Sequence, residues 1–129
     1  MQSPKRILCA DDDQHTNELL SFWLEKNGYE VKTVTTQTDA LALACRERFD
    51  LYLLDDLLPD GRGKDLILMI RDFDPKTPIV FLSGNVDEAN QQEILERVAQ
   101  SFIPKPSNLT RVTEIIEQLI AQDQVSGFN

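Results

Sequence analysis

Short apolar runs alternate along the chain with longer segments in which apolar residues recur every three or four positions. The run at 51–54 is continuously apolar, as in a parallel sheet that is covered on both faces. The segment 29–34 instead alternates between apolar and polar residues, which indicates a strand nearer the edge of the sheet. The pattern predicts strands at 7–10, 29–34, 51–54, 79–82 and 101–104, and helices at 17–27, after Thr36, at 64–72, at 87–100 and after Ser107.

Five strands that alternate with helices predict an α/β fold, with a parallel sheet and helices on both of its faces. The chain has 129 residues, which is the usual size of one domain. No internal repeat and no linker interrupts the alternation. We expect a single domain over residues 1–122, followed by a flexible tail over 123–129.

Composition narrows the class of protein. The chain is 41% hydrophobic and 27% charged, which is typical of a folded globular protein. Its net charge of −9 argues against direct binding of nucleic acid, which needs a basic surface. Because the chain has neither a long apolar segment nor a signal peptide, we expect a cytoplasmic protein that does not contact a membrane.

Cys9 and Cys45 fit no metal-binding spacing, and we interpret them as reduced, buried thiols.

Acidic side chains collect where two of the predicted strands end. Asp11, Asp12 and Asp13 follow the first strand, and Asp55 and Asp56 follow the third. In a parallel α/β sheet, ligands bind at the carboxyl ends of the strands, so these strand ends are expected to build one shared site, whereas Asp13 is expected to cap the helix that follows. Several carboxylates repel one another unless a cation joins them, and oxygen ligands without histidine or cysteine favour Mg²⁺.

Two other strand ends carry groups that suit a phosphoryl ligand. Ser83 follows the fourth strand and Lys105 follows the fifth. A lysine and a hydroxyl beside a metal supply positive charge and hydrogen-bond donors to phosphoryl oxygens. A carboxylate in such a site can act as a nucleophile and carry an aspartyl-phosphate.

Taken in order, these motifs resemble the receiver domain of response regulators, which act in two-component and phosphorelay signalling. The resemblance covers nearly the whole chain and rests on Asp11 and Asp12, the stretch "LLDDLLPDGRG", Ser83, and "FIPKP" around Lys105. It implies a flavodoxin-like, five-stranded sheet of order 2-1-3-4-5 in a three-layer sandwich.

The resemblance also assigns the roles of the acids. Receivers are phosphorylated on the aspartate four residues before the proline of this stretch, which is Asp55 and not Asp56. By the same likeness, Asp12 and Asp55 bind Mg²⁺ with their carboxylates, Leu57 with its backbone carbonyl and Asp11 through water. Asp56 departs from the family pattern, which mostly has an apolar residue there, and we expect its side chain to point toward solvent.

The remaining family positions lie in the second half of the chain. Ser83 and Lys105 match the residues that contact the phosphoryl group, and Ser83 and Phe102 match the pair that switches on phosphorylation. The bond between Lys105 and Pro106 is the candidate for the family's cis peptide. The implied partners are a sensor histidine kinase or a histidine phosphotransfer protein, and a downstream protein target. The implied catalysis is limited to the domain's own phosphorylation and dephosphorylation, so we do not expect an enzyme in the usual sense.

Three other interpretations remain open. A phosphatase of the haloacid dehalogenase type would carry a second aspartate two residues after the nucleophile, where this chain has Leu57. A flavin or nucleotide carrier would carry a glycine-rich phosphate loop after its first strand, and none is present. A degenerate receiver that only binds proteins would not need the full set of acids, hydroxyl and lysine.

Overall fold

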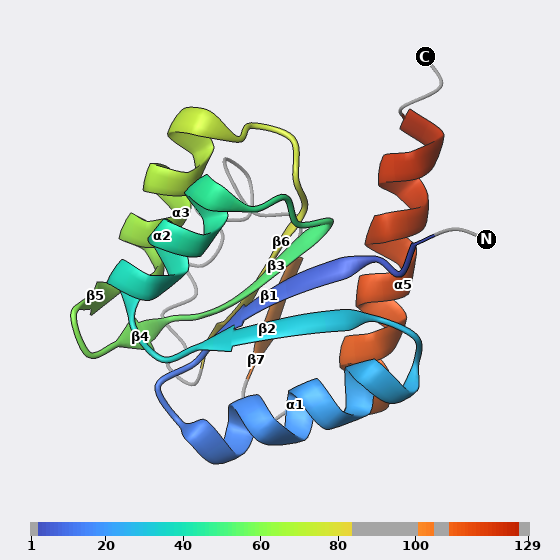
Figure 1. Ribbon diagram of the computed structural model, residues 1–129, viewed down its shortest axis with the longest axis horizontal. Coiled ribbons are helices and arrows are strands. Elements are labelled where there is room, and N and C mark those ends of the chain that lie inside the picture. The colour runs from blue at the N-terminus through green and yellow to red at the C-terminus, as the bar shows by residue number, and fades with distance from the viewer. Residues whose placement is uncertain (1–2, 84–100, 105–108, 127–129) are drawn as a thin grey trace.

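The computed structural model describes residues 3–83, 101–104 and 109–126, with side chains for 3–82 and 109–122 (Figure 1). Its main sheet has five strands in the order β2-β1-β3-β6-β7, and every neighbouring pair is parallel. A separate antiparallel hairpin, β4-β5, follows β3. The predicted parallel α/β fold is therefore confirmed, and the predicted edge strand, β2, does lie at an edge.

The elements follow the predicted alternation, with small shifts at their ends. Helix α1 begins three residues earlier than predicted, and the strand predicted at 101–104 is found at those residues. The predicted helix at 87–100 lies outside the described residues. The elements are β1 (Arg6–Ala10), α1 (Gln14–Lys26), β2 (Glu30–Val34), α2 (Gln37–Arg46), β3 (Leu51–Asp55), β4 (Leu57–Leu58), β5 (Gly61–Arg62), α3 (Gly63–Phe73), β6 (Ile79–Ser83), β7 (Ser101–Pro104) and α5 (Leu109–Ser126).

The two faces of the sheet are covered by different helices. Figure 1 shows α2 and α3 on one side and α1 and α5 on the other. Alternate residues of β3 divide between the two cores: Tyr52 and Leu54 pack with α2 and α3, whereas Leu51 and Leu53 pack with α1 and α5. This explains why β3 is apolar from Leu51 to Leu54, since neither face of it meets water.

Two expectations need correction, and one element was not predicted. Helix α5 continues to Ser126, into the segment expected as a tail. Glycine commonly follows the end of a helix, and the first glycine after the start of α5 is at position 127. Cys9 is buried as predicted, but Cys45 is exposed, because α2 turns Ala40 and Ala44 toward the sheet instead. The hairpin β4-β5 was not predicted, since two-residue strands show no sequence period.

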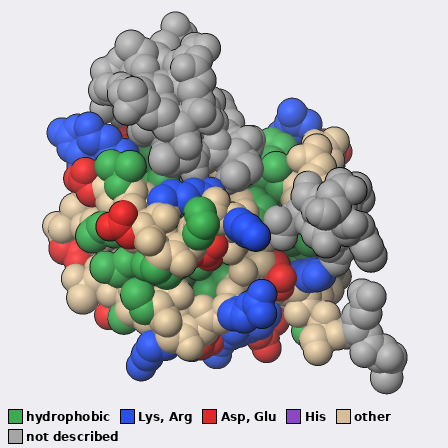
Figure 2. Space-filling model, turned by 90° about the horizontal axis from the view of Figure 1, so that it is seen from above, with side chains coloured by type: hydrophobic (Ala, Val, Ile, Leu, Met, Phe, Trp, Pro, Cys, Tyr) green, Lys and Arg blue, Asp and Glu red, His purple; other side chains and the backbone are tan. Residues whose placement is uncertain are grey.

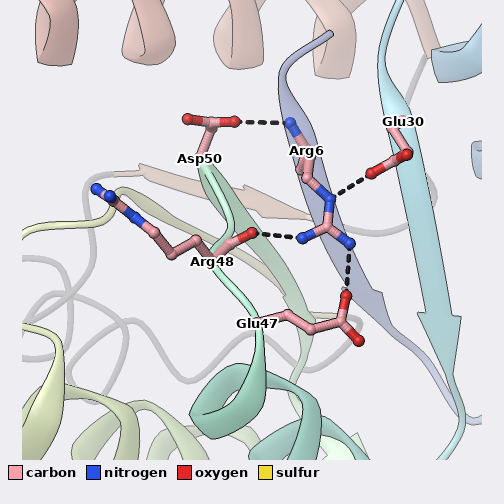
Figure 3. Close-up of polar contacts among 5 residues, drawn as sticks. All are labelled: Arg6, Glu30, Glu47, Arg48 and Asp50. Atoms are coloured by element: carbon pink, nitrogen blue, oxygen red, sulfur yellow. Dashed lines mark hydrogen bonds and ion pairs between the residues drawn. The ribbon is translucent and has the colours of Figure 1, made fainter. Parts of the chain in front are cut away.

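A cluster around Arg6 ties together elements at the amino ends of the strands (Figure 3). Its guanidinium pairs with Glu30 of β2 and with Glu47 after α2, the second pair at 2.5 Å. It also donates to the Arg48 carbonyl at 2.8 Å and lies over the Phe49 ring, 4.9 Å from the centroid. Arg6 therefore links β1, β2 and the α2-β3 connection at the edge opposite the acidic strand ends.

Candidate functional site

Three carboxylates meet at the carboxyl ends of β1 and β3. Asp11, Asp12 and Asp55 each offer an oxygen, and these oxygens lie within 4.8 Å of one another. Asp11 and Asp55 are 1% and 5% exposed, whereas Asp12 is open to solvent. The sequence prediction that these acids share one site is confirmed.

Strand register explains why residues so far apart in sequence converge. Ala10 of β1 is paired with Leu54 of β3, so the next residue along each strand is an aspartate. The backbone amide of Asp11 continues the pairing toward β2 by donating to the Val34 carbonyl at 3.2 Å. The carboxylate of Asp11 in turn accepts from the Asp13 amide at 2.9 Å, which fixes its orientation.

Asp13 has a different role from its two neighbours. It is the N-cap of α1, and its carboxylate accepts from the His15 amide at 2.9 Å and from the Thr16 hydroxyl at 3.2 Å. The His15 hydrogen bond is the main cause of the lowered pKa of Asp13. The third aspartate of the run thus starts the helix and is not part of the acidic cluster.

The loop after β3 is held close to the sheet. The amide of Asp56 donates to the Leu82 carbonyl of β6 at 2.8 Å, and the Asp56 carbonyl accepts from the Gly63 amide at 2.6 Å. Asp56 is half-buried and Leu57 is exposed. The backbone that follows Asp55 is therefore fixed by bonds on both sides.

Asp60, at the turn of the β4-β5 hairpin, caps the start of α2. Its carboxylate accepts from the Gln37 amide at 2.7 Å, and from the amide and hydroxyl of Thr38 at 2.9 and 2.7 Å. These bonds, led by the Thr38 hydroxyl, lower the pKa of Asp60 to about 2. The hairpin after the acidic site is thereby joined to a helix that precedes it in sequence.

The other predicted site residues lie at or beyond the boundary of the description. Ser83 ends β6, one residue after Leu82, which is paired with Asp55. Phe102 lies in β7, where it is paired with Phe81. Their side chains, like Lys105 and Pro106 altogether, lie outside the described residues, so the proposed contacts, switch and cis peptide stay predictions.

The acidic cluster has the chemistry of a Mg²⁺ site. All three side chains offer carboxylate oxygens, and neither histidine nor cysteine is among them. Mg²⁺ prefers oxygen ligands and usually keeps several waters, which suits a site in which Asp12 opens to solvent. The donor set therefore fits the predicted metal.

Comparison with known proteins identifies the family. The family model of the response regulator receiver domain matches residues 7–117. The chain belongs to the response-regulator receiver family. A solved receiver domain protein from Methanospirillum hungatei superimposes with a TM-score of 0.92 at 31% identity, over 96% of this chain and 99% of that one. The non-phosphorylated HemR receiver domain from Leptospira biflexa gives 0.85 at 35% identity, over 90% and 94%.

Curated relatives of this receiver are longer than it is. The response regulator protein PilR of Pseudomonas aeruginosa is 34% identical over 88% of this chain, which spans 26% of PilR. The transcriptional regulatory protein GltR of the same species is 33% identical over 93% of the chain, which spans 50% of GltR. The receiver thus corresponds to a quarter to a half of these relatives.

Nucleic-acid binding has to be considered because GltR is named a transcriptional regulator. That name describes the relative, and the expectation of no direct nucleic-acid contact concerns only this receiver. Figure 2 shows basic and acidic side chains interspersed on the face that it draws. Within the described ranges, no helix combines the length and the apolar character needed to cross a membrane.

Sequence reasoning missed two residues that shape the site. Asn17 is 3% exposed and donates to the Asp11 carbonyl, and Asp60 accepts from Gln37 and Thr38, which lie 23 and 22 residues before it in sequence. An asparagine within the apolar stripe of α1 was an available signal for the first. The second had none, since an aspartate beside proline and glycine looks like an ordinary turn residue.

Proposed function

We propose that this receiver accepts a phosphoryl group on Asp55 from a phosphohistidine and passes the signal to a protein partner. The convergence of Asp11, Asp12 and Asp55 within 4.8 Å is the observation that carries the proposal. Asp55 ends a central strand and is 5% exposed, so its carboxylate has a fixed place at the edge of the site. A fixed nucleophile loses little freedom when it attacks.

In the transfer, a carboxylate oxygen of Asp55 forms a bond to phosphorus, and the bond between phosphorus and the donor's histidine nitrogen breaks. The nitrogen keeps the electron pair of that bond. Asp12 and Asp55 would hold the metal with their side chains and Leu57 with its backbone carbonyl, and Asp11 would act through water. When bound, Mg²⁺ offsets the negative charge of the phosphoryl oxygens.

Lys105 and Ser83 complete the site by binding phosphoryl oxygens. The position of Ser83 supports this role, because it follows directly on the residue of β6 that is paired with Asp55. Phosphorylation then draws Ser83 toward the phosphoryl group and turns Phe102 inward, which alters the surface between residues 85 and 110. This change biases an existing equilibrium between two states.

The partners follow from this chemistry. The donor is a sensor histidine kinase or a histidine phosphotransfer protein in the cytoplasm, and the reader is a protein that recognises the altered surface. The receiver catalyses only its own phosphorylation and dephosphorylation. A phosphatase of the dehalogenase type is disfavoured by Leu57, which is 64% exposed and places an apolar side chain where that class needs an acid.

The proposal is tested by incubating the receiver with acetyl phosphate and measuring its intact mass. We expect the mass of one phosphoryl group to be added in the presence of Mg²⁺ and not when EDTA removes the metal. A mass that never changes, with the fold intact by circular dichroism, would favour the degenerate receiver that only binds proteins.

A further inference from the structure

Asn17 is a buried amide that bridges two backbone carbonyls beside the acidic cluster. It lies in the first turn of α1 and is 3% exposed. Its Nδ2 donates to the carbonyls of Asp11 at 2.9 Å and of Val34 at 3.0 Å. Its Oδ1 accepts from the thiol of Cys9 at 3.5 Å. Both donor hydrogens are therefore committed to the end of β1 and the end of β2.

The carbonyl of Asp11 belongs to the peptide that links Asp11 to Asp12. The Asn17 bond fixes the orientation of this peptide, and the Asp11 amide, which donates to Val34, fixes the peptide before it. The side chains of Asp11 and Asp12 are attached to the backbone on either side of the bonded carbonyl. Where their carboxylates lie thus depends on a side chain that is not itself an acid.

We propose that Asn17 is a positioning residue for the cation site, setting Mg²⁺ affinity by holding the peptide between Asp11 and Asp12. The inference rests on the proposed function, because it takes the acidic cluster to be the cation site of the phosphoacceptor. Residues that orient metal ligands typically change metal affinity by about 10- to 100-fold when they are removed. Asn17 acts through the backbone and touches neither the metal nor the phosphoryl group.

A buried asparagine also stabilises the fold, so the test needs a variant that loses a comparable bond elsewhere. Thr113 is 6% exposed, and its hydroxyl accepts from the Trp23 indole at 2.7 Å and donates to the Leu109 carbonyl at 2.9 Å. Thr113→Val removes the bond between α1 and α5 and the bond within α5 at nearly constant volume. It therefore lowers stability without touching the peptide of the acidic cluster.

The experiment titrates Mg²⁺ into the unphosphorylated wild type, Asn17→Ala and Thr113→Val, and follows backbone amides by NMR. We expect Asn17→Ala to weaken Mg²⁺ binding by about tenfold or more and Thr113→Val to change it by less than about twofold. The Asp12 amide signal, which follows the carbonyl bonded by Asn17, is expected to shift in the metal-free Asn17→Ala protein only. If Asn17→Ala does not fold, Asn17→Ser, which keeps one donor, is judged by the same criteria.

Equal Mg²⁺ affinity in the wild type and the Asn17 variant would overturn the inference, as would equal losses in the Asn17 and Thr113 variants. A wild type without Mg²⁺-dependent shifts would overturn it as well. Failure of the proposed function looks different, because it is a wild type that binds Mg²⁺ and gains no phosphoryl mass.

Discussion

Gly63 lies so close to the carbonyl of Asp55 that no side chain fits between them. A Cβ atom on Gly63 would collide with the Asp55 carbonyl oxygen and would lie 2.6 Å from the ring of Phe81. The Gly63 amide also donates to the Asp56 carbonyl at 2.6 Å. The start of α3 therefore packs directly against the backbone that carries the proposed phosphoacceptor.

The first prediction is that Gly63→Ala destabilises the fold by about 1–3 kcal/mol and slows the phosphorylation of Asp55. The reason is that the new methyl group meets backbone and an aromatic ring, neither of which can move freely. Gly61→Ala is the matched control, because the atoms nearest to its Cβ would be those at the flexible end of the Gln37 side chain. Urea unfolding measures the stability of both variants, and intact mass after incubation with acetyl phosphate follows their phosphorylation. Equal losses of stability in the two variants would contradict the close packing at Gly63.

Arg6 supports a second prediction. Replacing Arg6 with alanine is expected to lower the free energy of unfolding by about 1–2 kcal/mol, because the variant loses two carboxylate partners and a carbonyl. Arg6→Lys is expected to recover only part of the loss, since one ammonium cannot reach three acceptors in the same plane. The measurement is urea unfolding at low and high salt. A lysine variant as stable as the wild type would show that charge alone matters.

Asp60 gives a prediction about pH. Its pKa is lowered from 3.8 to about 2 by its bonds to Thr38 and Gln37, so the folded state favours the ionised form. The ionised Asp60 carboxylate therefore stabilises the folded state at pH values above the pKa that this residue has in the unfolded chain. This contribution is lost as the pH falls from about 4 toward 2. The stability difference between the wild type and Asp60→Asn should be constant near neutral pH and shrink over that range. Thermal unfolding at a series of pH values measures it, and a difference independent of pH would contradict the cap.

The fourth prediction separates two adjacent aspartates. Asp12→Ala should weaken Mg²⁺ binding by about tenfold or more, because it removes a carboxylate of the cluster. Asp13→Ala should lower stability through loss of the helix cap and leave Mg²⁺ affinity nearly unchanged. Calorimetric titration and thermal unfolding of both variants give the comparison. The reverse pattern would mean that the two roles are exchanged.

The fold was largely predictable because its central strands β1, β3 and β6 are buried on both faces and its helices on one. The run at 51–54 shows this most clearly, since the whole of β3 is buried. The acidic site was predictable because the carboxyl ends of parallel strands meet at one edge. Cys45 was misjudged because a helical period tells which residues share a face and not how wide the covered face is.

What the sequence did not reveal are contacts made by backbone groups of distant segments. Asn17 finds its acceptors on Asp11 and Val34, and Asp60 finds donors at the start of α2. Neither the backbone acceptors of Asn17 nor the donors to Asp60 belong to a sequence pattern that predicts the contact. Such bonds become visible only when the strand order brings the segments together.

Intact-mass measurement of two isosteric variants tests the central claim, that Asp55 is the phosphoacceptor, most directly. Asp55→Asn and Asp56→Asn each replace one carboxylate by an amide of nearly the same shape, and the two residues are adjacent. After incubation with acetyl phosphate and Mg²⁺, the account predicts an added phosphoryl mass in the wild type and in Asp56→Asn, and none in Asp55→Asn. An Asp55→Asn protein that gains this mass while Asp56→Asn does not would contradict the account.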